Sequence, residues 1–215
     1  MSKTKPVIVL LLIACVGGLI WYLARADVLT QAQTLPAPAS TTTTASRRAL
    51  APRNDLPGLT NFAQVSPNLY RGAQPTAEGF GALKKMGIKT VVSLRTLHSD
   101  RDLLQGTGLR YAHFQCKAWH PEEEDVVKFL KLMQDPANHP VFVHCQQGSD
   151  RTGMMVTVYR ITTEGWTPDA AMAELPNFGF HPIWTEIKEY LSQVDAAALK
   201  KKVEAAKMPG IETIN

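Results

Sequence analysis

Hydrophobic and polar residues alternate with two different periods between residues 58 and 206, which predicts strands and helices in turn. Short apolar or β-branched runs predict strands at residues 62–65, 69–71, 89–94, 110–116 and 140–144. Apolar residues recurring every three or four positions predict helices at residues 76–86, 99–105, 121–133, 151–163, 167–175 and 183–206. Because strands alternate with helices, we expect an α/β fold with a central, mostly parallel sheet flanked by helices.

Turn and capping residues mark the ends of several of these elements. Residues 66–68 (SPN) separate the first two strands and predict a short hairpin. Thr76 is expected to cap the first helix, and Gly87 to end it. Ser99 and Pro121 are expected to begin the next two helices.

Residues 7–23 form an uncharged apolar run at the N-terminus. As a helix this run reaches roughly 25 Å, slightly less than a hydrocarbon core about 30 Å thick. Two lysines precede it, which favours an orientation that exports the rest of the chain to the periplasmic or extracellular side. We therefore predict a hydrophobic helix that serves as a membrane anchor or signal segment over residues 1–26. The alternatives are a signal peptide cleaved at residues 24–26 (ARA), giving a secreted protein, and a lipoprotein processed at Cys15.

Residues 27–57 are rich in proline, alanine and threonine and poor in large apolar side chains. So little apolar surface cannot offset the entropy lost on ordering a chain, and we predict a flexible, disordered linker. The remaining residues, 58–215, suffice for one domain with a buried core.

The net positive charge of the chain lies entirely in its N-terminal 57 residues. The chain of 215 residues has a formal net charge of +4 at pH 7, which would suit a polyanionic partner. Six of the 23 basic and two of the 19 acidic residues lie in positions 1–57, which leaves 17 of each sign, and no net charge, in positions 58–215. The excess of basic residues therefore lies around the predicted membrane segment, where it would set the orientation of that segment in the membrane. We expect no nucleic-acid partner.

Residues 144–153 (HCQQGSDRTG) carry the candidate chemistry, between a predicted buried strand and a predicted helix. Such a turn presents backbone N–H groups and the positive end of a helix to an anion. Gly148 lets the loop curl, and Arg151, six residues after Cys145, can grip two phosphate oxygens in bidentate fashion. The same positive field favours the thiolate form of Cys145, and the Thr152 hydroxyl is placed to donate to its sulfur.

This His-Cys-x5-Arg-Thr-Gly segment resembles the signature of the protein tyrosine and dual-specificity phosphatases. Residues 69–75 (LYRGAQP) resemble the N-terminal signature of the atypical dual-specificity phosphatases of plants and fungi, and residues 159–166 (YRITTEGW) resemble bacterial relatives of that group. The resemblance extends from about residue 62 to residue 190. It implies a tyrosine phosphatase-like fold and a reaction that needs neither a metal nor another cofactor.

The resemblance also implies a role for each residue of the loop. Cys145 attacks phosphorus and forms a phosphocysteine, while Arg151 and the loop amides stabilise the transition state. The implied substrate-binding residues are Gln146, Gln147, Gly148, Ser149, Asp150 and Thr152.

A carboxylic acid completes the family's reaction, because it protonates the leaving oxygen and then activates water. Glu122 directly follows a proline in a Trp-x-Pro-acid arrangement, Asp125 lies three residues later, and Asp150 lies within the anion loop. Acidic residues at positions 122–125 also simply suit the N-terminus of a helix, so the sequence leaves the three candidates open.

Three further residues have both a functional and a structural interpretation. Arg95 and Arg101 could line the rim of the site or lie on a solvated surface. Cys116 is expected to be a buried free thiol, and the alternative is a reversible disulfide with Cys145 in an oxidising compartment.

The variable positions of the loop, 146, 147, 149 and 150, carry no basic side chain. Relatives that act on highly phosphorylated inositols tend to carry Lys or Arg there. We therefore expect a phosphorylated protein (phosphotyrosine, phosphoserine or phosphothreonine) or a small phosphomonoester as the substrate. A phosphoinositide phosphatase, a non-catalytic phosphate-binding module and a rhodanese-like sulfurtransferase are the alternatives.

Overall fold

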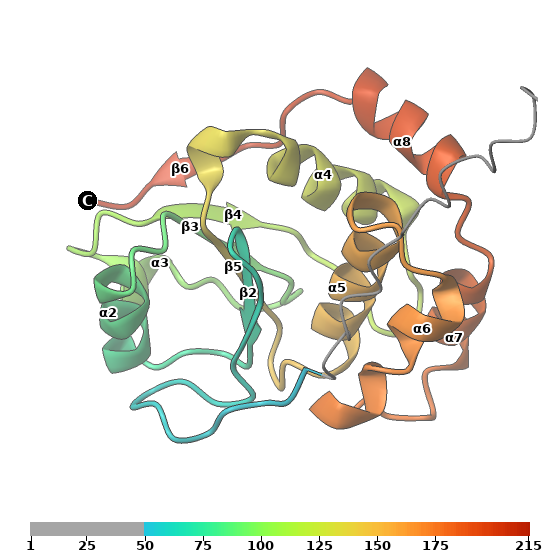
Figure 1. The fold of residues 1–215 in the computed structure, drawn as a ribbon. Coiled ribbons are helices and arrows are strands. Elements are labelled where there is room, and N and C mark those ends of the chain that lie inside the picture. The colour runs from blue at the N-terminus through green and yellow to red at the C-terminus, as the bar shows by residue number, and fades with distance from the viewer. Residues whose placement is uncertain (1–49) are drawn as a thin grey trace, which may run out of the picture. The chain divides into compact units, whose positions relative to one another are not determined.

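A six-stranded sheet forms the centre of the fold in the computed structural model, which describes residues 50–215 (Figure 1). Its strand order is β1-β2-β5-β3-β4-β6. The strands are β1 (Ala63–Ser66), β2 (Leu69–Gly72), β3 (Thr90–Ser93), β4 (Arg110–His113), β5 (Val141–His144) and β6 (Glu212–Thr213). The four inner strands are mutually parallel, and β1 and β6 are antiparallel to their neighbours. The predicted mostly parallel sheet and the β1–β2 hairpin are therefore confirmed.

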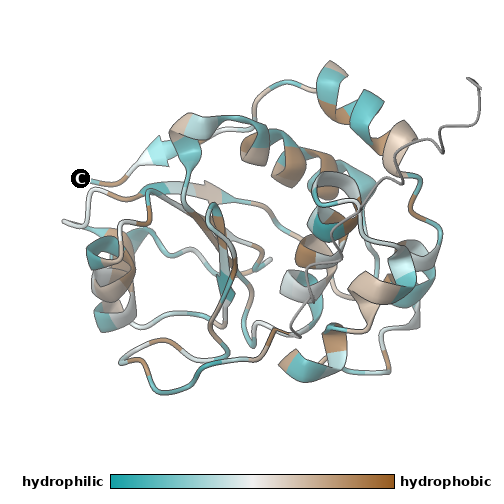
Figure 2. Ribbon diagram, in the orientation of Figure 1, coloured by the Kyte–Doolittle hydropathy of each residue, from teal (hydrophilic) through white to brown (hydrophobic). Residues whose placement is uncertain are grey.

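Helices cover both faces of this sheet. They are α2 (Ala77–Lys85), α3 (Arg101–Leu104), α4 (Glu123–Gln134), α5 (Asp150–Thr163), α6 (Pro168–Met172), α7 (Thr185–Ser192) and α8 (Ala196–Ala205), with short 3₁₀ turns at Pro136–Asn138 and Leu175–Phe178. One buried cluster packs α2 and α3 against the sheet, and a larger one packs α4, α5, α7 and α8 on the other face. Hydrophobic residues of α4 and α5 gather where these helices meet the sheet (Figure 2).

The register of the parallel strands brings three strand ends to one place. Gly72 at the end of β2 and Ser93 at the end of β3 both pair with His144 at the end of β5. Loops at the carboxyl ends of parallel strands form the sites of such folds. The chain that follows His144 is thus flanked by two neighbouring loops.

Several predicted element ends move in the structure. The short helix begins at Arg101 with Asp100, not Ser99, at its N-cap, and Ser99 instead accepts a hydrogen bond from the Arg101 amide. Glu122, one residue after Pro121, is the N-cap of α4. The strand predicted over residues 110–116 ends at His113, because the chain then leaves the sheet.

The predicted helix over residues 183–206 is wrong as a single element. It is divided into α7 and α8, and Asp195 begins α8 by accepting hydrogen bonds from the amides of Ala197 and Ala198. A carboxylate that caps two amides stabilises a new helix start, which helical periodicity alone does not reveal.

Residues 50–57, which the sequence analysis placed in the linker, contact the domain. Arg53 exchanges two backbone hydrogen bonds with Phe62, and Leu56 packs against the smaller buried cluster. The Leu50 carbonyl accepts a hydrogen bond from Asn177. The predicted hydrophobic helix and most of the predicted linker lie outside the described residues. Within residues 50–215, no helix has both the length and the apolar character needed to cross a membrane.

Candidate active site

The predicted anion loop lies between β5 and α5. Cys145 directly follows the buried strand and is 2% exposed, and α5 begins at Asp150. Gly148 has a φ of +73°, and a Cβ atom there would lie 2.5 Å from the carbonyl carbon of Gly72. Only glycine therefore fits this position, where the loop both turns and approaches β2 closely.

Three consecutive carbonyls of this loop accept hydrogen bonds from the N-terminal part of the domain. The amide of Gln74 donates to Gln146 O at 3.1 Å, Asn61 Nδ2 donates to Gln147 O at 2.9 Å, and Arg71 Nη2 donates to Gly148 O at 2.6 Å. The C=O and N–H groups of a trans peptide point in opposite directions. The three amides that follow these carbonyls therefore point away from their donors, in a row suited to binding an oxyanion.

Arg151 lies in the first turn of α5, half-buried, and its Nη1 donates to the carbonyl of Leu94 at 3.2 Å. This bond ties the guanidinium to the residue that directly follows β3. Thr152 is fully buried, and its hydroxyl has no hydrogen-bond partner within residues 50–215. The hydrogen bond predicted from Thr152 to the Cys145 sulfur is therefore not formed in this structure.

A buried polar network holds His144, the residue that directly precedes Cys145. His144 Nε2 lies 2.8 Å from Asp100 Oδ2, and Asp100 Oδ1 accepts a bond of 2.7 Å from Gln74. Burial alone would raise the pKa of Asp100, but the hydrogen bond and charge of His144, together with the bond from Gln74, lower it overall. Asp100 therefore fixes the imidazole and the start of the loop.

The two candidate rim arginines have different positions. Arg95 donates to Gln74 Oε1 at 2.9 Å, so it joins the network beside the loop. Arg101 forms an ion pair of 2.6 Å with Glu212 and lies over the ring of Tyr111, which ties α3 to the C-terminal strand. Of the two, only Arg95 is bonded to this network.

The three candidate acids occupy different environments. The Glu122 side chain is 42% exposed and pairs with Lys117 at 3.1 Å. The Asp125 side chain is only 13% exposed, its Oδ1 lies 3.5 Å from Lys128 Nζ, and its carboxylate lies against the Cys116 thiol. Asp150 accepts hydrogen bonds from the backbone amide of His181 and lies 3.0 Å from its ring, so both of its oxygens are engaged.

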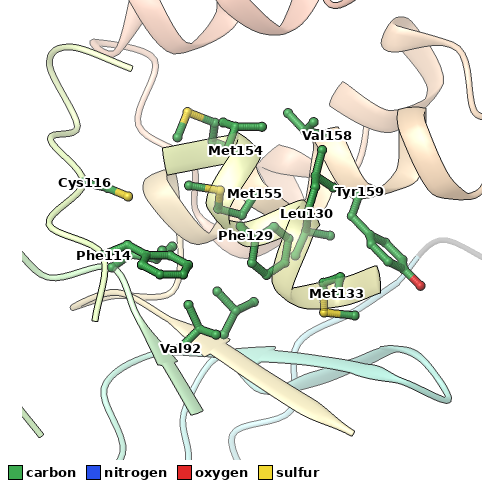
Figure 3. Close-up of a cluster of buried hydrophobic side chains, with 14 of the residues drawn as sticks. Val92, Phe114, Cys116, Phe129, Leu130, Met133, Met154, Met155, Val158 and Tyr159 are labelled. Atoms are coloured by element: carbon green, nitrogen blue, oxygen red, sulfur yellow. The ribbon is translucent and has the colours of Figure 1, made fainter. Parts of the chain in front are cut away.

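Cys116 and Cys145 are both free and buried, and both belong to the larger hydrophobic cluster. Figure 3 shows Cys116 at the edge of this cluster, with its sulfur directed inward. Burial raises the pKa of the Cys116 thiol, and Asp125 adds to the increase, while the charge of Arg151 opposes it. Because a thiolate is the attacking species in disulfide formation, this environment makes Cys116 a slow attacker of an oxidised Cys145.

Asn61, Arg71 and Asp100 belong to the site although no pattern in the sequence predicted them. Arg71 lies inside the segment 69–75 that carries the family resemblance, which is the one signal that could have drawn attention to it.

Comparison with known proteins agrees with this geometry. The model of the tyrosine phosphatase family matches residues 58–212. The dual specificity protein phosphatase TpbA of Pseudomonas aeruginosa is 34% identical over 121 residues, which cover 56% of this chain and 55% of that protein. The inositol diphosphatase DSP3 of Arabidopsis thaliana is 27% identical over 53% of this chain and 60% of its own length. The match therefore spans little more than half the length of these relatives.

The structural comparison covers more of the chain. The crystal structure of P. aeruginosa TpbA superposes with a TM-score of 0.63 and 27% identity, over 75% of this chain and 99% of that one. A complex of a TpbA variant with phosphotyrosine gives the same TM-score at 26% identity. Since one family model accounts for nearly all of the folded part of the chain, from residue 58 to residue 212, the protein belongs to the tyrosine phosphatase family.

Proposed function

We propose that this protein is a cysteine-dependent phosphatase that hydrolyses phosphomonoesters of proteins through a phosphocysteine intermediate. The observation that carries the proposal is the anion loop itself. Cys145 begins the loop, three of its carbonyls are held by outside donors so that the amides that follow point the other way, and Arg151 is bonded to the carbonyl of Leu94. This arrangement matches the charge and shape of a phosphoryl group in transfer.

The proposed reaction has two steps. The Cys145 thiolate forms a bond to phosphorus while the bond to the ester oxygen breaks, and a carboxylic acid gives its proton to that leaving oxygen. Water then attacks the phosphocysteine, the same carboxylate accepts a proton from it, and phosphate and the thiolate are released. Arg151 and the loop amides hold the non-transferring oxygens in both steps.

We assign the proton donor to Asp125. Its carboxylate is mostly enclosed and lies against Cys116, a thiol that also feels the charge of Arg151. The acid therefore faces the part of the domain where the anion loop lies. Glu122 instead faces solvent beside Lys117, and Asp150 is held by His181.

Asp125→Asn is expected to lower kcat for an alkyl phosphate about 100-fold or more, because the leaving oxygen then departs without a proton. The loss should be much smaller for an ester of an acidic phenol, which needs no protonation. Both effects are measured as kcat for the two esters.

Glu122→Gln is the matched control, since it removes an acid from the same helix start, and we expect kcat to change less than about threefold. If Glu122→Gln lowers kcat more for the alkyl phosphate than for the phenol ester, and Asp125→Asn does not, then Glu122 is the proton donor.

A singly phosphorylated side chain is the proposed substrate. None of the loop side chains at positions 146, 147, 149 and 150 is basic, and positions 58–215 have no net charge, so little attracts a densely charged ligand. The phosphotyrosine complex of TpbA supports this choice. A phosphoinositide or another small phosphomonoester is the second candidate, which Asp150 in the loop favours.

A substrate panel tests the proposal with the purified full chain in detergent and a reducing agent. We expect kcat/KM for phosphotyrosine peptides to exceed that for inositol polyphosphates and phosphoinositides by at least about tenfold. A reversed order would favour the second candidate. Binding of phosphopeptides without turnover of any ester would favour the non-catalytic module.

We also propose that the protein is anchored in a membrane. The apolar run at residues 7–23 supports a membrane anchor with the domain on the periplasmic or extracellular side, with secretion after signal cleavage as the alternative. Retention of the chain in membranes after alkaline carbonate extraction tests the anchor.

A further inference from the structure

The most exposed large apolar side chains within residues 50–215 lie on loops that neighbour the anion loop. Leu97 is 98% exposed, Ile183 is 74% exposed and Trp119 is 60% exposed. Leu97 follows β3 and Trp119 follows β4, so both lie at the edge of the sheet where the anion loop follows β5. Met208 and Met86, the next in exposed fraction, follow α8 and α2 instead. Single apolar side chains on a surface are ordinary, but a group of them around one site indicates a contact surface.

Hydrogen bonds join the loops after β3 and β4 to each other and to the anion loop. Thr96 Oγ1 donates to the carbonyl of Cys116 at 2.9 Å, which connects residues 94–98 with the loop that follows β4. Arg151 Nη1 donates to the carbonyl of Leu94, at the start of the first of these loops. These contacts fix the positions of both loops, and of the exposed side chains that they carry, relative to Arg151.

The segment that carries Ile183 is bonded to the anion loop on its other side. The amide of His181 donates to Asp150 Oδ1 at 2.8 Å, and Asp150 directly precedes Arg151. The same segment forms one wall of a mainly apolar groove with a volume of about 620 Å³. The apolar side chains that line this groove belong to Met172, Leu175, Pro176, Phe180 and Pro182. An apolar groove of this kind can receive an apolar side chain of a bound partner.

We propose that Leu97, Trp119 and Ile183, together with this groove, form a docking surface for apolar side chains that flank the phosphorylated residue of a polypeptide substrate. The anion loop binds the phosphoryl group, which every phosphorylated residue carries, so the loop alone does not distinguish one protein sequence from another. Removal of exposed apolar area from water on both partners supplies that preference. This inference rests on the proposed function, because it names the sequences that the same site would select.

The charges of the same loops favour a polypeptide over a lipid bilayer. An anionic bilayer attracts clusters of unpaired Lys and Arg side chains. The loops at residues 94–100, 114–122 and 179–184 carry only Arg95 and Lys117. Arg95 donates to Gln74, and Lys117 is paired with Glu122 at 3.1 Å. These loops therefore present apolar side chains without the unpaired positive charge that binding to an anionic bilayer requires.

The experiment compares two phosphotyrosine peptides of equal net charge as substrates of the full chain in detergent and a reducing agent. One peptide carries Leu and Phe on each side of the phosphotyrosine, and the other carries Ser at the same positions. We expect kcat/KM for the apolar peptide to exceed that for the Ser peptide about tenfold or more, chiefly through a lower KM. In the combined variant Leu97→Ser, Trp119→Ser and Ile183→Ser, the ratio of the two kcat/KM values should fall to about threefold or less. The three side chains are exposed, so the variant loses little core packing and is expected to fold.

Met86→Ser combined with Met208→Ser is the matched control, because it also removes exposed apolar side chains, at the end of α2 and after α8. We expect this control to keep the preference for the apolar peptide. Equal kcat/KM for the two peptides on the unmodified chain, or a preference that the combined variant keeps, would overturn the docking surface and leave the phosphatase function standing.

Two further measurements separate the remaining outcomes. If no ester is turned over, the phosphatase function fails, and binding of the same two peptides, measured by fluorescence anisotropy, tests the docking surface with the same expected preference. A phosphoinositide in mixed micelles with the same detergent tests a surface that faces a membrane. Loss of turnover of that lipid in the combined variant, with equal kcat/KM for the two peptides, would overturn the proposal in favour of a membrane-facing surface.

Discussion

Cys145→Ser is expected to reduce kcat/KM for an aryl phosphate by about four orders of magnitude or more. A serine hydroxyl is not ionised near neutral pH, so it needs a neighbouring base to become a nucleophile. His144 cannot serve, because its Nε2 is bonded to Asp100 and its Nδ1 lies 3.1 Å from the Cys145 carbonyl. Steady-state turnover of the full chain under reducing conditions measures the loss.

The same substitution should preserve binding. The loop amides and Arg151 stay in place, so we expect Cys145→Ser to bind a phosphotyrosine peptide with an affinity within about fivefold of the unmodified chain. Cys116→Ser is the matched control, and it should retain turnover within about threefold while losing some stability, because it places a hydroxyl in an apolar cluster. Turnover that survives Cys145→Ser would contradict the phosphocysteine mechanism. Absence of turnover by the unmodified chain would contradict the phosphatase function.

The local part of this site could be predicted because its determinants are contiguous in the sequence. A buried strand, a tight turn and a helix start all lie within residues 141–153, and each leaves a pattern of its own. Gly148 illustrates the point, since its left-handed backbone and its close approach to β2 both require the residue type that the loop was predicted to need.

The supporting part of the site could not be predicted in this way. Asn61 and Arg71 are 86 and 77 residues away from the carbonyls that they hold, and Asp100 is 44 residues away from His144. Polar residues of these types are usually exposed, so their presence in the sequence indicates nothing about a site. The parallel pairing of β2 with β5 brings Arg71 to the loop, and the pairing of β3 with β5 brings the chain that leads to Asp100 beside it.

The fold shows the same division between local and distant determinants. The alternation of strands and helices was sufficient to predict the sheet, since each element has its own hydrophobic period. The two-residue strand β6 was missed, because Glu212 and Thr213 form a strand only by pairing with Tyr111 and Arg110. The break between α7 and α8 likewise depends on one capping side chain, Asp195.

Arg151→Lys is expected to lower kcat/KM by about 100-fold or more, and Arg151→Ala by about 1000-fold or more. The guanidinium is held by its bond to Leu94 O, so it can offer the rest of its planar fork to two oxygens of the phosphoryl group. A lysine keeps the charge but acts as a point donor, and it loses the second parallel hydrogen bond in the transition state. Kinetics with an aryl phosphate measure both variants, and the loss should fall mainly on kcat.

Arg95→Lys is the appropriate comparison, because Arg95 lies beside the same loop but is bonded to Gln74. We expect it to change kcat/KM by less than about tenfold. If Arg151→Lys retains as much activity as Arg95→Lys, a positive charge alone is sufficient at position 151. The bidentate contact of Arg151 with two phosphoryl oxygens would then not contribute to the reaction. If Arg95→Lys loses as much kcat/KM as Arg151→Lys, the network of Arg95, Gln74 and Asp100 is as important for the reacting phosphate as Arg151 is.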